Sequence, residues 1–171
     1  MRRAISILGV GLLLLSLQSM AKAGEARSPR AVIEMSAGKI VIELYEKDAP
    51  ETVANFVKLA KKGFYDGLSL HRVVPGFVVQ GGDPKGDGTG GPGHTIKDEF
   101  NSRKHLTGTV AMARTPAPNS AGSQFYICLA PQPALDGRYA VFGQVVEGMD
   151  VVMKIKKGDI MKKVAIMEVA R

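Results

Sequence analysis

Two side chains in the segment 70–83 have types and a spacing that could do chemistry. Alternation places Arg72, and further along Gln80, among apolar positions of two neighbouring strands. An arginine among valine and phenylalanine side chains is costly to bury unless its donors find acceptors. A donor that never loses its charge can stabilise electron density that develops on a substrate. The alternative is a structural arginine paired with a carboxylate, and the spacing alone leaves that alternative open.

The other candidates for chemistry carry weaker signals. The three histidines, His71, His94 and His105, lack the i, i+3 or i+4 pairing of helical metal ligands, so we expect no metal site. Ser123 lies in Gly-Ser-Gln and not in the G-x-S-x-G turn of a serine hydrolase. The loop 81–93 holds seven glycines but lacks G-x-x-x-x-G-K-[ST], which favours a surface loop with positive φ over a phosphate site. We therefore expect neither a metal nor a cofactor.

The scaffold that must position these side chains is predicted to be rich in β-strands. Short apolar stretches bounded by glycine, proline or polar turns indicate eight strands. They are 31–36, 39–44, 69–74, 77–80, 109–113, 124–129, 140–145 and 160–169. Many short strands divided by glycine turns suit a closed antiparallel β-barrel, which leaves no strand edge exposed.

Two helices are expected to cap the ends of this barrel. Asp48 as N-cap and Glu51 as its capping-box partner predict that one helix starts there, and Gly63 predicts its end. A second helix is expected after Gly148 and is expected to stop at Gly158. The fold class predicted from the pattern is therefore mainly β, with eight strands and two α-helices.

The N-terminal segment 1–23 has the layout of a secretory signal peptide. A basic start, an apolar run over 4–17 and an A-x-A site ending at Ala23 predict cleavage after that residue. An apolar run of about 14 residues is too short for a spanning helix, so no stable membrane anchor is expected. After the cleavage site we expect a loose leader over 24–30 and then one domain over 31–171. The signal predicts a periplasmic protein, and the same signal would serve secretion beyond the periplasm.

Charge and cysteine content narrow the function classes further. Loss of Arg2, Arg3 and Lys22 with the signal peptide lowers the formal net charge from +7 to +4. This surplus is spread along the chain without interleaved aromatic residues, so nucleic-acid binding is not expected. The single cysteine, Cys128, excludes an internal disulfide and is expected to be buried in a strand.

The segment 71–83, HRVVPGFVVQGGD, closely resembles the signature of the cyclophilin-type peptidyl-prolyl cis-trans isomerases. The resemblance covers about residues 31–169 and continues in four further blocks. These are GTGG at 88–91, GSQFYI at 122–127, LDG at 135–137 and VFGQV at 141–145. The family's fold, a closed eight-stranded antiparallel barrel capped by two helices, agrees with the predicted elements.

The resemblance implies a role for each candidate site residue. Arg72 would be the catalytic arginine, Gln80 would orient the substrate, and Phe77 would complete the catalytic set while lining the proline pocket. The residues implied to bind substrate are Val78, Tyr126 and Leu135 in the pocket, Tyr139 at its rim, and Ala113, Arg114 and Gln124 on the side that precedes proline.

Three positions depart from the pattern common in eukaryotic members of the family. Val78 stands where methionine is frequent, Ala134 where tryptophan is frequent, and Tyr139 where histidine is frequent. The segment 112–125 is similar to the bacterial branch. The loss of tryptophan predicts weak binding of cyclosporin-like macrocycles and leaves the catalytic set intact.

Physical chemistry accounts for this residue set without a nucleophile or a cofactor. Partial double-bond character makes an X-Pro bond isomerise slowly, and a twisted transition state turns the imide nitrogen into a hydrogen-bond acceptor. A donor such as Arg72 would stabilise that state more than either planar ground state. The expected function is prolyl isomerisation in unfolded or exposed segments of exported proteins, by a monomer. The alternative is a proline-binding, chaperone-like module with little turnover, and Arg72 favours the enzyme.

Overall fold

The computed structural model describes residues 28–167, and the predicted signal peptide (1–23) lies outside them. The strands are β1 (Arg30–Met35), β2 (Gly38–Leu44), β3 (Arg72–Val74), β4 (Val78–Gly81), β5 (Thr109–Met112), β6 (Phe125–Cys128), β7 (Val141–Glu147) and β8 (Lys163–Met167). The helices are α1 (Pro50–Lys61), α2 (Met149–Val152) and a single 3-10 turn, η1 (Pro133–Leu135). Among these residues, no helix has the length and apolar character needed to cross a membrane.

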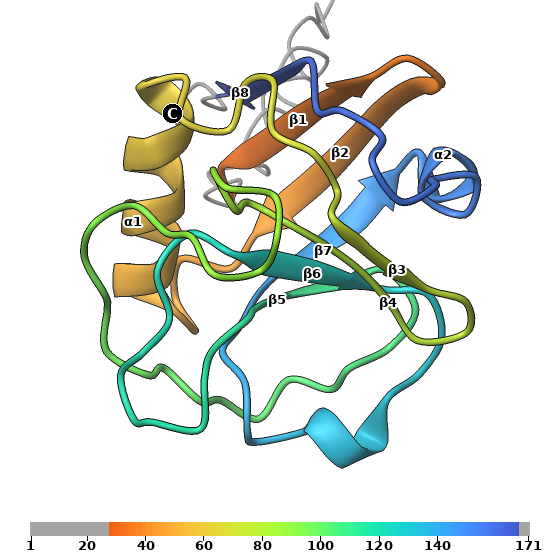
Figure 1. Cartoon of the computed structure of the whole chain (residues 1–171). Helices are drawn as coiled ribbons and strands as arrows, with labels where there is room; N and C mark the ends of the chain where they lie inside the picture. The colour runs from red at the N-terminus through yellow and green to blue at the C-terminus, as the bar shows by residue number, and fades with distance from the viewer. Residues whose placement is uncertain (1–27, 168–171) are drawn as a thin grey trace, which may run out of the picture.

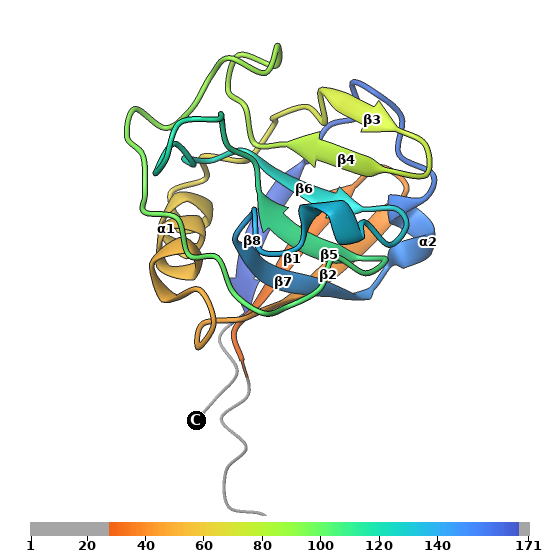
Figure 2. The same cartoon turned by 90° about the horizontal axis from the view of Figure 1, so that it is seen from below.

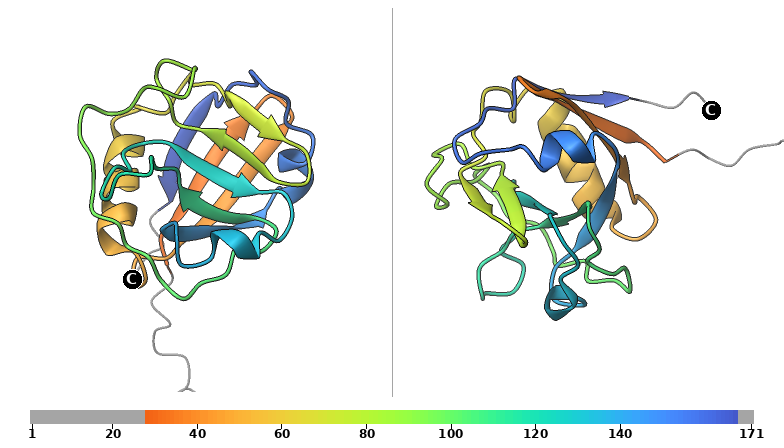
Figure 3. Two further views of the ribbon diagram at one scale, coloured as in Figure 1. Left: turned by 60° about the horizontal axis from the view of Figure 1, so that its bottom comes forward. Right: turned by 90° about the vertical axis from the view of Figure 1, so that its right-hand side faces the viewer.

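The eight strands form one antiparallel sheet in the order β3-β4-β6-β5-β7-β2-β1-β8. The sheet curls round on itself, with α1 and α2 at opposite ends of the curled sheet (Figures 1 and 3). The predicted number of strands, their antiparallel pairing and the mainly β class are thus confirmed. The β1–β2 hairpin turns at Gly38, as the sequence predicts.

The closure predicted for the barrel is not confirmed, because β3 and β8, the two ends of the strand order, share no ladder. Backbone hydrogen bonds cross this seam just before the two strands, over 67–70 and 158–161. Leu70 N–H donates to the Asp159 carbonyl at 2.8 Å, and Met161 N–H donates to the Leu68 carbonyl at 2.9 Å. The expected strands 69–74 and 160–169 lose their first residues to this seam, so β3 and β8 are shorter than predicted.

Two apolar clusters occupy the two faces of the central strands. The inward cluster includes Val79, Val110, Phe125, Ile127 and Phe142, with α1 and α2 packed against it. The outward cluster consists of Val78, Ala111, Tyr126, Cys128 and Val141. Successive side chains of a strand point to opposite faces, so strands that are buried on both faces are apolar throughout. The burial expected of Cys128 is confirmed, and η1 lies over this outward face (Figure 2).

Helix α1 is capped differently from the prediction. Ala49 is its N-cap residue and offers no side-chain hydrogen bond. The carboxylate of Glu99 instead accepts the backbone N–H groups of Glu51 at 3.0 Å and Thr52 at 2.7 Å. Asp48, the predicted cap, is engaged by Arg103, whose Nη2 lies 2.8 Å from Oδ2. The capping-box prediction is therefore wrong, because a distant loop supplies the acceptor.

The ends of the two helices are predicted with unequal success. Gly63, at φ +69°, follows the Lys62 C-cap of α1, as expected. Helix α2 starts after Gly148 but ends at Val152, well before Gly158. Turns follow up to that glycine, and within them the Asp159 carboxylate accepts the Lys156 N–H at 2.9 Å.

Candidate active site

A pocket of about 190 Å³ opens on the outward face of the sheet. Val78 and Tyr126 of the outward apolar cluster form its floor, and its walls come from the turn after β3, from the residues that follow β5 and from the segment around η1. The residues that line it are Arg72, Phe77, Val78, Gln80, Ala113, Arg114, Tyr126, Leu135 and Tyr139. Nine of the ten site residues predicted from the sequence therefore meet in one cavity.

The tenth residue, Gln124, lies in an adjoining groove and contacts the pocket through Gln80. Arg72 and Gln80 are paired across β3 and β4, which places both side chains on the same face. Nη1 of Arg72 donates to Oε1 of Gln80 at 3.2 Å, and Nε2 of Gln80 donates to Oε1 of Gln124 at 3.0 Å. A chain of amide contacts thus links the arginine to the groove.

The guanidinium of Arg72 is exposed and keeps donors available. Its central carbon lies 5.4 Å from the centre of the Phe77 ring, within the range of a cation–π contact. In the part of the chain that the structure describes, no carboxylate pairs with it. The alternative of a structural arginine neutralised by a carboxylate is therefore not supported.

The floor of the pocket is apolar and partly aromatic. Val78 and Tyr126 are almost fully buried, and Phe77, Leu135 and Tyr139 pack against them. The rings of Tyr126 and Tyr139 meet edge to face, with centroids 5.8 Å apart. Burial raises the pKa of the Tyr126 hydroxyl, so this side chain stays neutral. Such a floor suits a small apolar group.

Arg114 forms a second cationic wall, but its charge is partly neutralised. Nε lies 3.3 Å from Oδ1 of Asp98, and Nη2 donates to the Ala117 carbonyl at 3.0 Å. Its guanidinium carbon also lies 5.3 Å from the centre of the exposed Phe100 ring. The side chain is held in one place, beside the groove that contains Gln124.

The glycine-rich loop 81–93 borders this groove, which measures about 750 Å³. Asp83 lies within the loop and is 1% exposed. Burial raises the pKa of its carboxyl, but backbone N–H groups of Lys85, Gly88, Gly90 and Asp87 more than offset that effect and hold the pKa below its usual range. The loop therefore wraps its own carboxylate, and Gly88 has a φ of +91°, as expected of a glycine turn.

The three histidines lie apart from one another and serve different local contacts. His94 Nε2 lies 2.7 Å from Oδ1 of Asn55, and His105 is buried against Asp136 and Tyr126. Desolvation lowers the pKa of His71, whose Nδ1 is buried without a hydrogen-bond partner. Over residues 28–167 no cluster of three or more ligating side chains could hold a metal ion.

Comparison with known proteins decides the family. Residues 30–170 match the family model described as cyclophilin type peptidyl-prolyl cis-trans isomerase/CLD. The chain belongs to the cyclophilin-type peptidyl-prolyl cis-trans isomerases. The family and the enzyme class predicted from the sequence are thereby confirmed.

Bacterial relatives of this cyclophilin support the same assignment. It is 50% identical to a peptidyl-prolyl cis-trans isomerase of Helicobacter pylori over 81% of this chain and 87% of the relative. It is 52% identical to peptidyl-prolyl cis-trans isomerase B of Bacillus subtilis over 75% of this chain and 90% of the relative.

A cyclophilin-type isomerase of Cryptosporidium parvum, crystallised in the presence of the dipeptide Ala-Pro, has a similar fold. The two structures agree with a TM-score of 0.75 at 30% identity, over 81% of this chain and 98% of the other.

Sequence reasoning misses the side chains that support the pocket of this cyclophilin from behind. The sequence presents His105 only as a candidate metal ligand, and Asp136 only as part of the LDG block. Asp136 lies in a family-like block and His105 lies in none of them; their partners are distant in sequence, and no local spacing indicates the contacts. The contacts of Asp98 and Phe100 with Arg114 are missed for the same reason.

Proposed function

We propose that the pocket is the site of isomerisation and that Arg72 is its catalytic residue. The observation that carries this proposal is an exposed guanidinium at the mouth of an apolar pocket, with no carboxylate partner among the described residues. Phe77, Val78, Tyr126 and Leu135 form the apolar enclosure in which a proline ring would lie.

Rotation about the X-Pro bond removes the resonance between the carbonyl and the imide nitrogen. The nitrogen then gains a lone pair that can accept a hydrogen bond from Arg72. Because the planar cis and trans states lack this acceptor, the interaction lowers the barrier selectively. Gln80 holds the guanidinium with its Oε1 and lines the same pocket, where it can orient the adjoining carbonyl.

The side of the substrate that precedes proline would lie along Ala113, Arg114 and the groove with Gln124. Tyr139 would close the rim. The Cryptosporidium relative crystallised with Ala-Pro supports a proline-containing peptide as the ligand of this pocket as well. No step in this mechanism needs a metal or a cofactor.

The test is prolyl isomerisation of an Ala-Pro peptide in a protease-free assay. Removal of a donor aimed at a transition state typically costs about a hundredfold, so Arg72→Ala should lower kcat/KM by about that factor. Arg138→Ala removes an exposed arginine outside the pocket and serves as the matched control. Unchanged turnover in Arg72→Ala would overturn the mechanism and favour a proline-binding module with little required turnover.

The biological role that we propose is assistance to the folding of exported proteins. The layout of residues 1–23 supports export to the periplasm. Expression with this segment in a Gram-negative host should yield a monomeric periplasmic protein whose first residue is Gly24. A protein retained in the cytoplasm with Met1 intact would contradict the export proposal.

Weak cyclosporin binding is also proposed. Ala134 lies exposed within η1, beside the pocket residue Leu135, and presents only a methyl group there. Ala134→Trp would add an apolar surface at the pocket edge and should tighten cyclosporin binding, measured by inhibition of isomerisation. Equal inhibition of both proteins would contradict this proposal.

A further inference from the structure

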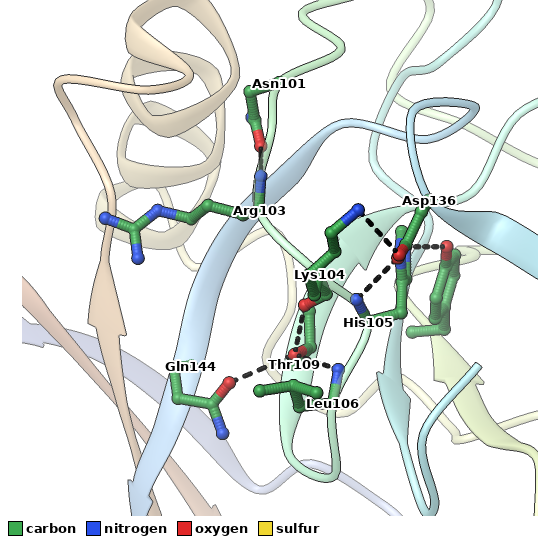
Figure 4. Close-up of polar contacts among 9 residues, drawn as sticks. Asn101, Arg103, Lys104, His105, Leu106, Thr109, Asp136 and Gln144 are labelled. Atoms are coloured by element: carbon green, nitrogen blue, oxygen red, sulfur yellow. Dashed lines mark hydrogen bonds and ion pairs between the residues drawn. The ribbon is translucent and has the colours of Figure 1, made fainter. Parts of the chain in front are cut away.

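A buried histidine, His105, joins two walls of the pocket from behind. It is 1% exposed and lies in the segment that leads into β5. It does not line the cavity, and the mechanism above gives it no role. Figure 4 shows His105 in a polar cluster with Lys104 and Asp136, and its ring also contacts the hydroxyl of Tyr126.

One side of the imidazole is bound to Asp136. Nδ1 lies 3.0 Å from Oδ1, and the His105 backbone N–H donates to the same oxygen at 2.8 Å. Lys104 Nζ lies 3.2 Å from the other carboxylate oxygen. Hydrogen bonds from the His105 backbone and ring hold the pKa of Asp136 below its usual range. The carboxylate is an acceptor only, so Nδ1 of His105 carries a proton.

The other side of the imidazole is bound to Tyr126, whose ring forms the pocket floor. Nε2 lies 3.0 Å from the tyrosine hydroxyl oxygen. In the neutral ring, with its one proton on Nδ1, Nε2 accepts this bond and the tyrosine O–H donates it. The hydroxyl is thereby directed away from the cavity, and the ring is left to meet an apolar substrate group.

The backbone of His105 fixes the opposite wall. Its carbonyl accepts the Gln132 N–H at 2.8 Å. The segment 132–136 is therefore attached to His105 at both ends, through Gln132 and through Asp136. Leu135, a wall of the cavity, lies in η1 between these two attachments.

We propose that His105 is a positioning residue that sets the separation of Tyr126 and Leu135, and so the width of the proline pocket. This inference rests on the proposed role of the pocket. A rigid supporting contact keeps the enclosure near the size of a proline ring before substrate arrives. Loss of either bond should therefore weaken substrate binding more than it slows the rotation step.

Two substitutions separate the two contacts. An asparagine amide can reach the place of Nδ1, so His105→Asn can keep the contact with Asp136 but loses the hydrogen bond to the Tyr126 hydroxyl. A glutamine amide can reach the place of Nε2, so His105→Gln can keep the hydrogen bond to the Tyr126 hydroxyl but loses the side-chain contact with Asp136. Each variant should lower kcat/KM for an Ala-Pro peptide by about three- to tenfold, mainly through a higher KM.

Tyr126→Phe removes the same contact as His105→Asn without changing a buried histidine, and it keeps the test valid if the histidine variants fold poorly. It should raise KM comparably. The double variant Tyr126→Phe with His105→Asn should be no worse than the more affected single variant, because one bond is lost in each case.

The matched control is Thr109→Val. Thr109 is buried in the same cluster of Figure 4, and its hydroxyl bonds to the Lys104 carbonyl and to Gln144, with no contact to the pocket. It should lower the Tm while leaving kcat/KM within about twofold.

Three results would overturn the inference. The first is that the folded single variants keep the KM of the wild type. The second is that the effects of Tyr126→Phe and His105→Asn on KM multiply in the double variant. The third is that Thr109→Val loses as much activity as the His105 variants. An inactive wild-type protein, or a fully active Arg72→Ala, would instead refute the proposed site. The two failures are thus distinguishable.

Discussion

Gln124 determines which way the amide of Gln80 points. Nε2 of Gln124 donates to the carbonyls of Gly88 at 3.0 Å and Gly90 at 2.8 Å. Its Oε1 is therefore the atom that faces Gln80, and it accepts the Gln80 Nε2 at 3.0 Å. The Gln80 oxygen is left for Arg72. The glycine-rich loop thus orients Arg72, the proposed catalytic residue, through two successive amides.

Gln124→Leu should lower kcat/KM by about tenfold, because both amides lose their fixed orientation while Arg72 is retained. Gln124→Glu should lower it further, since a carboxylate would face two carbonyl oxygens. Gln144→Leu is the control, because Gln144 also donates to a loop carbonyl, that of Thr107, but lies outside the pocket. Kinetics on an Ala-Pro peptide check this, and equal activity of the Gln124 and Gln144 variants would contradict it.

Glu99→Ala should destabilise the protein by about 1–2 kcal/mol, because it removes the acceptor for the first N–H groups of α1. Glu51→Ala, which alters the residue that the sequence indicates as capping partner, should change stability by less than about 0.5 kcal/mol. Urea unfolding measures both. A larger loss of stability in Glu51→Ala than in Glu99→Ala would contradict this prediction and support the capping box.

Asp83→Asn should reduce the free energy of unfolding and should also make that free energy less dependent on pH in the acidic range. The folded-state pKa of Asp83 is depressed, so its stabilisation is present above the unfolded pKa of about 3.9 and is lost as pH falls towards the folded value. The wild type should therefore lose stability below about pH 4, and the variant should lose less there. Urea unfolding at a series of pH values tests this, with Asp150→Asn as a control for loss of an exposed carboxylate. Parallel curves for wild type and Asp83→Asn would refute it.

Cys128 should resist thiol reagents in the folded protein. Burial raises the pKa of this thiol to about 12, so very little reactive thiolate exists near neutral pH. Labelling with a chromogenic disulfide at mildly alkaline pH should be slow until urea unfolds the chain. Because the chain holds one cysteine, the signal is unambiguous. Rapid labelling without denaturant would show that the outward face opens.

The sequence predicts the strands well because they depend on short-range alternation, which assigns successive residues of β4 and β6 to opposite faces. The pocket roles of Val78 and Tyr126 come from the resemblance to a known family, because alternation within one strand does not set the register between two strands. The burial of Cys128 is expected for a different reason, because a spare exposed thiol is a hazard in an oxidising compartment.

Features that depend on partners distant in sequence could not be predicted. Glu99 caps a helix that begins nearly fifty residues earlier, and Asp48 is withdrawn from that role by Arg103. His105 lies far in sequence from Asp136 and Tyr126, so nothing in its neighbourhood distinguishes a supporting residue from a metal ligand. Helix α2 also ends at Val152, earlier than the glycine spacing indicates.

The way in which the sheet ends matters for the proposed action on unfolded chains. Strands with free edges recruit other extended segments and lead to aggregation. Here β3 is only three residues long, and the outer edge of β8 is blocked where the Asp66 carboxylate accepts the Val164 N–H at 2.8 Å. The seam before Arg72 occupies the backbone groups of Leu70 as well. Under the proposed function, an unfolded substrate would therefore find a pocket for its proline but few free strand edges to pair with, and it would dissociate readily after isomerisation.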